Sequence, residues 1–343
     1  GSIGSEIVRQ CMYYQPKKVI LLDQAESPLY ELEFELKTKH PDFFEIAECV
    51  MADVRDARRM RKVFEVFNPS IVFHAAAYKH VPLMEDNPYE AVGVNILGTR
   101  NVADMAIEFG AEKFVMVSTD KAVNPTNVMG ATKRTAELYT QSVGAKSSKT
   151  QFITTRFGNV LGSNGSVIPV FRKQLEKGGP ITITHRDITR YFMTIPEAAL
   201  LVVHASCIAR GGEVFVLDMG QPVSIFDMAK RMIHLMGKRY SAEDREAGIS
   251  IQFTGLRPGE KLHEELIIGE SVEGTQHPKI MLARETYLSF EMLQDRVLQL
   301  RESARNGEFS RVYSLFEELV DGYHRSEPRK AASKSARPEG RLH

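Results

Sequence analysis

An apolar strand pattern that ends in polar residues and leads into a helix most constrains the fold of this chain. Residues 113–117 read Lys-Phe-Val-Met-Val, and residues 118–121 read Ser-Thr-Asp-Lys. A turn through Asn124 and Pro125 then leads to a helix that we expect to begin near Val128. Polar residues after a strand lie at the carboxyl edge of a sheet, where open α/β folds bind ligands. The stretch therefore predicts a ligand site in an α/β fold.

Other short apolar runs, each followed by a turn or a helix pattern, predict the rest of the sheet. They occupy residues 18–23, 49–54, 71–74, 151–156 and 213–217, and a helix is expected over 56–67. Strands that alternate with helices are typical of a parallel sheet. We therefore expect a Rossmann-like, doubly wound parallel sheet.

The first residues, Gly1-Ser2-Ile3-Gly4, lead directly into a helix pattern. Glycine at a helix start allows backbone N–H groups to approach a pyrophosphate at the positive end of the helix. A Gly-Ser remnant of an expression tag is the alternative. Asp23 follows the glycines by roughly 20 residues, the spacing of an acid that binds an adenosine ribose. An acid there favours NAD over NADP, although Asp23 also suits a helix N-cap or a turn.

Composition excludes several function classes. Basic and acidic side chains balance at 44 each, and the last twenty residues hold six Lys or Arg against two Glu. The remaining chain is thus slightly acidic, which argues against a nucleic-acid partner. Cys11, Cys49 and Cys207 are widely spaced, so we expect reduced thiols in a cytoplasmic setting and no metal site. No apolar run reaches the ~20 residues that span a bilayer, and we expect no signal peptide.

The stretch STDKAVNPTNVMGATKR resembles the active site of the extended short-chain dehydrogenase/reductases, in which a Tyr-x-x-x-Lys pair lies on the helix after the strand. Here Met129 takes the tyrosine position, four residues before Lys133 on the same helix face. This departure resembles the membrane-associated, methionine-containing branch of the UDP-N-acetylglucosamine 4,6-dehydratases of bacterial polysaccharide pathways. Three further strings resemble the same enzymes: HAAAYKHVP at 74–82, RFGNVLGSNGSVIP at 156–169 and RPGEKLHEEL at 257–266.

The resemblance implies a bound NAD. Gly1 and Gly4 match the last two glycines of the T-G-x-x-G-x-x-G motif, so the first glycine and its strand would precede residue 1 and the chain would be a fragment of a longer protein. Asn95 would brace the site through backbone hydrogen bonds, with a helix-surface amide as the alternative. The full set of cofactor contacts would be Gly1, Ser2, Ile3, Gly4, Asp23, Asp53, Val54, Ala75, Ala76, Ala77, Asn95 and Lys133.

The resemblance also implies a UDP-sugar substrate and two domains. The NAD-binding domain would cover 1–158 and 191–222, and the smaller α/β sugar-nucleotide domain would cover 159–190 and 223–322. A disordered basic tail would cover 323–343. The expected substrate contacts are Lys79, Asn159, Ser166, Val167, Arg190, Arg257 and Glu260. We further expect a homo-oligomer and, through a longer parent chain, the cytosolic domain of an inner-membrane protein.

The implied reaction oxidises C4 of the sugar, removes water across C5–C6 and returns hydride to C6. By position, Asp120 would be the acid for the leaving hydroxyl, Lys121 would transfer the C5 proton and Thr119 would bind O4. Lys133 would bind the nicotinamide ribose. Met129 cannot exchange a proton, so water, Asp120 or Lys133 would accept the C4 hydroxyl proton.

Two alternative functions stay open at this stage. One is another UDP-sugar enzyme, either an epimerase or a C5-inverting dehydratase. The other is a non-catalytic sugar-nucleotide-binding module, which the methionine and the incomplete glycine motif favour and the intact Asp120, Lys121 and Lys133 disfavour.

Overall fold

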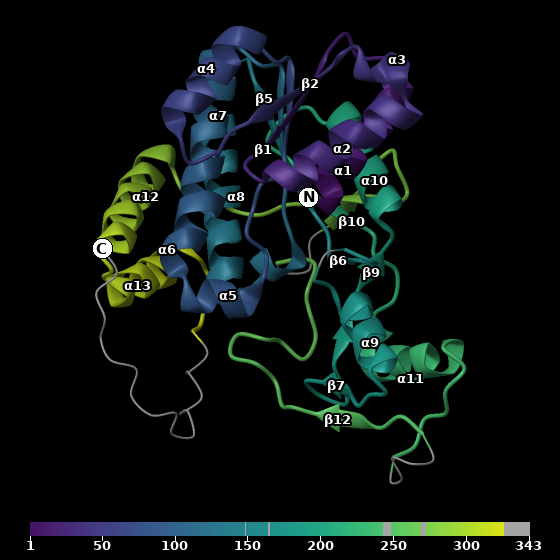
Figure 1. Cartoon of the computed structure of the whole chain (residues 1–343). Helices are drawn as coiled ribbons and strands as arrows, with labels where there is room; N and C mark the ends of the chain where they lie inside the picture. The colour runs from purple at the N-terminus through teal and green to yellow at the C-terminus, as the bar shows by residue number, and fades with distance from the viewer. Residues whose placement is uncertain (148, 164, 243–247, 269–271, 326–343) are drawn as a thin grey trace.

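The computed structural model describes residues 1–325 except 148, 164, 243–247 and 269–271. These residues form a central sheet whose strands are β3 (Ile71–His74), β4 (Lys113–Val117), β5 (Gln151–Arg156), β10 (Val214–Leu217), β13 (Val272–Gly274) and β14 (Ile280–Ala283). Their spatial order is β13-β14-β10-β5-β4-β3 (Figure 1). The pairs among β3, β4, β5 and β10 are parallel, as predicted, whereas β14 runs antiparallel to both neighbours. The sequence did not predict this antiparallel edge.

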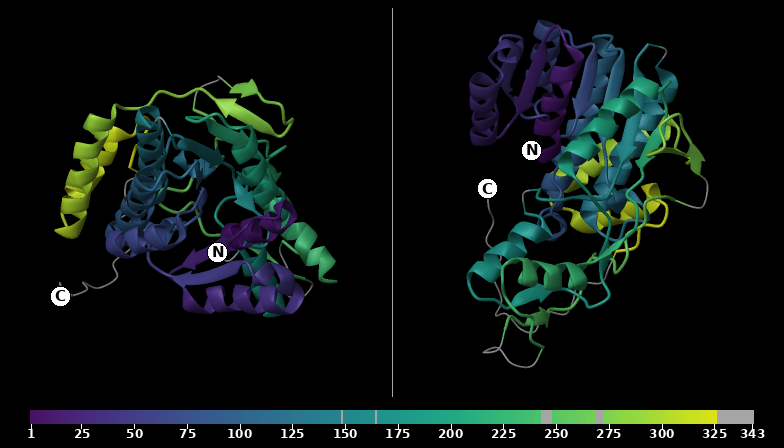
Figure 2. Two further views of the ribbon diagram at one scale, coloured as in Figure 1. Left: turned by 90° about the horizontal axis from the view of Figure 1, so that it is seen from above. Right: turned by 90° about the vertical axis from the view of Figure 1, so that its right-hand side faces the viewer.

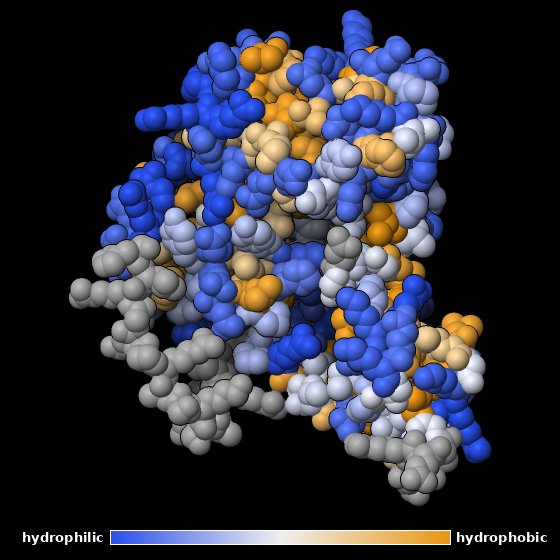
Figure 3. Space-filling view, in the orientation of Figure 1, coloured by the Kyte–Doolittle hydropathy of each residue, from blue (hydrophilic) through white to orange (hydrophobic). Residues whose placement is uncertain are grey.

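Two further parallel strands, β1 (Val19–Asp23) and β2 (Ala47–Met51), form a separate pair. Figure 3 shows apolar surface at the top of the molecule, near α4 (Ala57–Phe67) and the neighbouring strands. Exposed Met51 and Val66 help line a shallow depression there.

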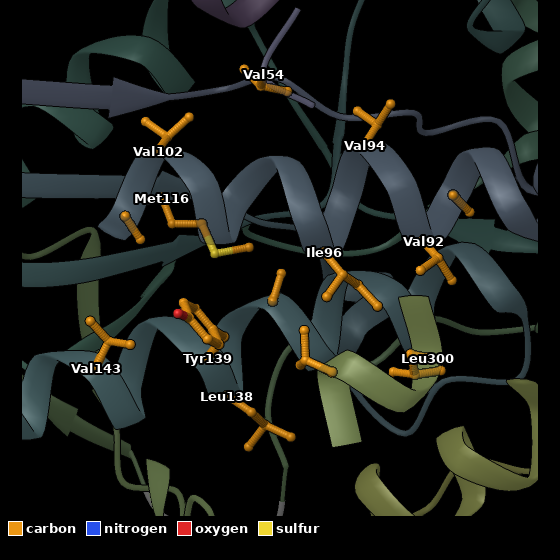
Figure 4. Packing of buried hydrophobic residues seen from close by; sticks show 14 of the residues in the cluster. Val54, Val92, Val94, Ile96, Val102, Met116, Leu138, Tyr139, Val143 and Leu300 are labelled. Carbon is orange, nitrogen blue, oxygen red and sulfur yellow. The ribbon is translucent and has the colours of Figure 1, made fainter. Parts of the chain in front are cut away.

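Helices cover both faces of the sheet (Figure 2). The first face carries α4, α7 (Thr99–Glu108), α8 (Val128–Lys146), α12 (Phe290–Arg305), α13 (Phe309–Leu319) and the π-helical turn η2 (Val92–Gly98). The second carries α1 (Ser2–Cys11) and α10 (Ile195–Ile208). Figure 4 shows Ile96 of η2 and Leu300 of α12 beside α8. Because neighbours enclose α8, every residue from Val128 to Val143 is buried.

The remaining segments are short or peripheral. On the large unit they are η1 (Met12–Tyr14), α2 (Glu26–Lys39), α3 (Pro41–Phe44), α5 (Val81–Asp86), α6 (Pro88–Ala91) and η3 (Asp120–Ala122). Leu29, Leu32 and Leu36 form a buried stripe on α2. Among the described helices, none is long and apolar enough to cross a membrane.

A smaller lobe lies below the sheet in Figure 1. It contains α9 (Val167–Glu176), β7 (Ile181–Ile183), α11 (Ile225–Leu235) and β12 (Ile251–Phe253), which share one apolar cluster. Parallel pairing joins β7 to β12. Ser224 caps α11 by accepting from the Asp227 N–H. Short pairs connect the lobe to the large unit: β6 (Asn159–Val160) with β9 (Phe192–Met193), and β8 (Thr189–Arg190) with β11 (Val223–Ser224).

The second domain is smaller than the sequence suggested. Strands β13 and β14 extend the main sheet, and α12 and α13 pack on α8, so residues 272–319 belong to the large unit and not to the expected 223–322 domain. The apolar faces of α12 and α13 pack into the main hydrophobic core of the large unit. Tyr323, placed in the expected tail, is buried against Phe316. Residues 326–343 of that tail lie outside the described residues.

Candidate active site

The short turn η3 places three predicted residues at the carboxyl end of β4. The Thr119 hydroxyl donates to Asp120 Oδ1 at 2.8 Å and accepts from the Lys121 N–H at 3.3 Å. Asp120 is fully buried, and its Oδ2 has no hydrogen-bond partner among the described residues. An unpaired buried carboxylate oxygen costs free energy. This oxygen is therefore available to a group that the protein itself does not supply.

Lys121 lies within a cage of oxygen atoms. Its Nζ is 2.9 Å from Asp120 Oδ1, 3.2 Å from Asn159 Oδ1 and 3.8 Å from Glu264 Oε1. Burial by itself would lower the pKa of Lys121, but the negative charges of Asp120 and Glu264 outweigh burial and raise that pKa. The raised pKa favours the ammonium form of Lys121.

The helix face that carries Met129 and Lys133 is buried against the sheet. Lys133 Nζ donates to the carbonyl of Val117, the last residue of β4, at 2.9 Å. Burial lowers the pKa of Lys133 to about 8, and the charge of Glu137 opposes only part of that shift. Met129 is 2 % exposed and belongs to the apolar core. Met129 therefore packs in the apolar core, and the lowered pKa of Lys133 allows a neutral amine near pH 8.

Asn95 braces the loop after β3. Its Oδ1 accepts from the Tyr78 N–H at 2.8 Å, and its Nδ2 donates to the Tyr78 carbonyl at 3.0 Å and to Thr132 Oγ1 at 3.0 Å. The side chain is fully buried, so the alternative of a surface amide is wrong. Through these bonds η2 fixes the loop that carries Ala75, Ala76 and Ala77 relative to α8.

The predicted dinucleotide residues gather at one end of the sheet. The Gly1 nitrogen lies 3.6 Å from Asp23 Oδ2, at the carboxyl end of β1. A Cβ added to Gly1 would meet nothing within 4 Å, and one added to Gly4 would lie 3.9 Å from Ala75. Ser2 and Ile3 form the first turn of α1 with them. Open space above a helix N-terminus, beside an acid, suits a dinucleotide.

Two further predicted cofactor contacts, Asp53 and Val54, which the resemblance would place beside the adenine, are less open. Asp53 accepts from both the backbone N–H and the Nε of Arg55 at 2.8 Å. Val54 is 8 % exposed and packs against Gly98, where an added Cβ would lie 2.6 Å from Val54 Cγ2. Figure 4 shows Val54 facing Val94 and Val102. Val54 therefore serves the core in this structure, and its contact with adenine stays a prediction.

The predicted substrate residues fall into two groups. Lys79 and Asn159 lie at the Lys121 end of the site: Lys79 Nζ is 3.4 Å from Ser163 Oγ, and Asn159 contacts Lys121 directly. Partial burial and the charge of Lys121 lower the pKa of Lys79. Ser166 and Val167 start α9, where the Ser166 hydroxyl is buried and has no partner among the described residues.

The second group comprises Arg257 and Glu260, on the segment that begins at Arg257, and Arg190 of β8, which contacts that segment. Arg190 donates to the carbonyls of Thr189, Lys261 and Leu262, so much of its guanidinium is already engaged. Glu260 accepts from Thr184 Oγ1 at 3.1 Å and from the N–H of exposed Arg257 at 3.0 Å. Contacts of these three side chains with a sugar nucleotide stay predictions.

The sequence missed two sets of charged residues beside the site. Glu264, within the 257–266 string but given no role, lies between Lys121 and Arg190. Behind Lys133, a buried network joins Arg134, Glu137, Arg156 and Glu285. Ser118 Oγ donates to Glu137 at 2.5 Å, which ties this network to the strand end. No sequence signal identified partners separated by up to 151 residues. The described residues include no cluster suited to a metal ion.

The parallel strand order, the helix that starts with glycines and the Lys133 face of α8 define the short-chain dehydrogenase/reductase class of Rossmann-like proteins. A family model for polysaccharide biosynthesis proteins matches residues 1–285. The chain therefore belongs to the polysaccharide biosynthesis protein family.

Similar proteins agree with this assignment. The capsular polysaccharide biosynthesis protein CapD of Staphylococcus aureus is 57% identical over 267 residues, which cover 78% of this chain and 43% of CapD. An inverting UDP-N-acetylglucosamine 4,6-dehydratase of Campylobacter jejuni is 32% identical over 78% of this chain and 75% of its own length. The crystal structure of Pen from Bacillus thuringiensis superposes with a TM-score of 0.74 at 34% identity, covering 87% of this chain and 94% of Pen.

The chain spans less than half the length of the first of these relatives, and 46% of the polysaccharide biosynthesis protein EpsC of Bacillus subtilis.

Proposed function

We propose that this chain carries out the NAD-dependent dehydration of UDP-N-acetylglucosamine to its 4-keto-6-deoxy sugar, as a step in bacterial glycan synthesis. The buried Asp120–Lys121 pair carries the proposal, because it presents beside an ammonium a carboxylate oxygen that no described residue contacts by a hydrogen bond. A dehydration needs such a pair, since one group must protonate the departing hydroxyl while another accepts a carbon-bound proton. The activity in the name of the C. jejuni relative supports the reaction class.

The residues at the carboxyl edge of the sheet fit NAD. Gly1 to Gly4 would face its pyrophosphate, Asp23 its adenosine ribose, and Lys133 its nicotinamide ribose. Ala75, Ala76 and Ala77 leave space beside the loop that Asn95 holds. When bound, the nicotinamide would accept a hydride from C4 and return it at C6.

The protein's own groups would then move the protons. Lys121 gives a proton to Asp120, so an N–H bond breaks, an O–H bond forms, and an amine and a carboxylic acid result. Asp120 passes this proton to the C6 hydroxyl, which departs as water. The neutral Lys121 amine takes the C5 proton and returns it to C5 at the end of the cycle. Lys121 regains its missing proton from solvent before the next turnover.

Among the candidates for the C4 hydroxyl proton, the structure favours Lys133. Its pKa of about 8 makes a neutral amine available near neutral pH, whereas Met129 offers no basic atom. Lys133 would release this proton to solvent after each cycle. Thr119, which already contacts Asp120, would bind O4.

The test is to incubate the chain with NAD and UDP-N-acetylglucosamine. Proton NMR should detect a 4-keto-6-deoxy product. Absence of product, with UDP-sugar binding intact, would overturn the proposal and favour a binding module.

An inverting dehydratase is the second candidate, because the C. jejuni relative carries that description. An inverting enzyme would return the proton to the opposite face of C5. The configuration at C5 of the NMR product distinguishes the two outcomes.

A further inference from the structure

Glu264 lies where the smaller lobe meets the predicted catalytic turn. Its side chain is 5 % exposed, and Oε1 lies 3.8 Å from Lys121 Nζ and 3.7 Å from Arg190 Nε. Burial raises the pKa of Glu264, and the charge of Asp120 adds to that effect, whereas Lys121, Arg190 and Lys261 oppose it. Burying a carboxylate costs free energy unless nearby cations compensate its charge. Lys121 and Arg190 lie close enough to Glu264 to do so.

The segment around Glu264 is fixed against the turn by other bonds. Thr126 and Asn127 both donate to the Gly259 carbonyl, at 3.0 and 2.9 Å. Lys261 Nζ donates to the Val123 carbonyl at 3.1 Å. Gly259 has φ of +74°, and a Cβ there would lie 2.6 Å from Asn127 Cβ, so only glycine allows this approach. The segment therefore holds Glu264 at a set distance from Lys121.

Asp120 and Glu264 approach Lys121 from different parts of the chain. Asp120 is its neighbour in sequence, whereas Glu264 comes from a segment more than a hundred residues away. Arg190 engages the carbonyls of Lys261 and Leu262 and so orients the same segment. The charge of Arg190 lowers the pKa of Lys121, and the charge of Lys121 in turn lowers the pKa of Lys79. Two carboxylates thus share one ammonium at the point where the proton transfer would begin.

We propose that Glu264 is a positioning residue that holds the Lys121 ammonium beside Asp120 and keeps it charged until the proton passes to Asp120. The proposal rests on the dehydratase function for its role in turnover, but the Lys121–Glu264 coupling itself does not. Removing the charge of Glu264 should weaken the hold on the proton of Lys121, because one of its two nearby carboxylates is lost.

The first experiment measures Lys121 without using activity. Trace acetylation with acetic anhydride across pH 6–11, followed by peptide mass spectrometry, gives the pH midpoint of Lys121 reactivity. In Glu264→Gln this midpoint should fall by about one pH unit. The matched control is Glu265→Gln, an adjacent carboxylate whose side chain is 49 % exposed, and it should leave the midpoint unchanged. An unchanged midpoint in Glu264→Gln overturns the proposal.

The second experiment measures turnover. If the wild-type chain forms the 4-keto sugar, Glu264→Gln should lower kcat on the order of tenfold with little change in KM, and should move the alkaline limb of kcat to lower pH. Glu264→Asp retains the charge and should restore that limb, even if the shorter side chain reduces kcat. A change confined to KM would overturn the positioning role.

The two experiments separate the two proposals. Absence of product from the wild type would refute the dehydratase function, while the acetylation midpoint would still decide the Lys121–Glu264 coupling. Circular dichroism of both variants shows whether they fold. If Glu264→Gln does not fold, Glu264→Ala, which also removes the charge, replaces it in the acetylation experiment with the same fall of the midpoint expected.

Discussion

Lys121 Nζ lies 2.9 Å from Oδ1 of Asp120, the residue directly before it in the chain. Neighbouring side chains on an extended strand point to opposite faces. The η3 turn breaks that alternation and brings both groups to one side, where Asn159 also contacts Lys121. A charge-assisted pair of this kind is strong. The second Asp120 oxygen has no hydrogen-bond partner in the part of the chain that the structure describes.

Asp120→Asn tests the acid role. The amide cannot relay a proton, so formation of the 4-keto sugar should fall by at least ~100-fold. Binding of UDP-N-acetylglucosamine, measured by calorimetry, should persist, because the amide preserves the shape of the side chain. Asp42→Asn, at an exposed position, is the control. Near-full turnover in Asp120→Asn would exclude the acid role.

Met129→Leu tests whether the methionine takes part in the chemistry. The side chain lies in the apolar core, and exchange of Met for Leu conserves volume at a cost of less than about 1.5 kcal/mol. We expect turnover within about tenfold of the wild type. A larger loss, in a variant with an unchanged melting temperature, would give the sulfur a role beyond packing.

Gly130→Ala tests the contact between α8 and the turn. A Cβ at this position would overlap the Lys121 carbonyl oxygen and lie 3.0 Å from Pro125 Cβ. The turn must move, so we expect a loss of turnover on the order of 100-fold and of about 1–3 kcal/mol in stability. Gly274→Ala is the matched control, since its Cβ would meet nothing within 4 Å. Equal behaviour of the two variants in kinetics and urea unfolding would contradict the expectation.

Lys133→Met tests the low pKa of the buried lysine. The pKa of Lys133 is about 8 in the folded chain, against an ordinary value of 10.5. Between these two pH values the unfolded chain therefore binds a proton at Lys133 that the folded chain has released. The lysine therefore penalises folding below pH 8, and the free energy of unfolding recovers by about 3 kcal/mol as pH rises to 10.5. Lys133→Met should lose this recovery.

Urea unfolding of the NAD-free chain at pH 7.5 and pH 10.5 measures the effect. Lys146→Met, on the same helix but 52 % exposed in its side chain, should behave as the wild type does. If Lys133→Met and the wild type respond equally to pH, the lysine has an ordinary pKa.

Glu137→Gln tests the buried charge network. Burial would raise the pKa of Glu137, but Arg156 and Arg134 outweigh it and lower the pKa to about 2. The contribution of Glu137 to stability is thus complete above pH 4.5 and is lost as pH falls toward 2. At pH 7 the substitution should cost about 3–5 kcal/mol, because it leaves two buried arginines with one carboxylate.

Chemical unfolding at pH 7 and pH 3 checks this prediction. The difference in the free energy of unfolding between Glu137→Gln and the wild type should be smaller at pH 3 than at pH 7. The control Glu31→Gln, at an exposed site, should change the free energy of unfolding little at either pH. A loss below about 1 kcal/mol at pH 7 would show that the network is dispensable.

The sequence predicted the strands and helices that carry the site because their patterns are local. The run at 113–117 became β4, and the helix expected near Val128 begins at that residue. Asn127 caps it by accepting from the Gly130 N–H. The antiparallel edge of β13 and β14 and the packing of α12 on α8 were not predicted, since both depend on which core accepts an apolar face.

The sequence by itself determined the residue types at the site. It places Thr119, Asp120, Lys121 and Lys133 in one strand–turn–helix unit. It also has methionine at position 129, whose side chain cannot exchange a proton. Only the tertiary structure decided their charge states. Glu264 approaches Lys121 across a separation of more than a hundred residues and helps keep it an ammonium, while burial under α8's neighbours lowers the pKa of Lys133. A protonation state depends on distance and solvation, and neither exists until the chain has folded.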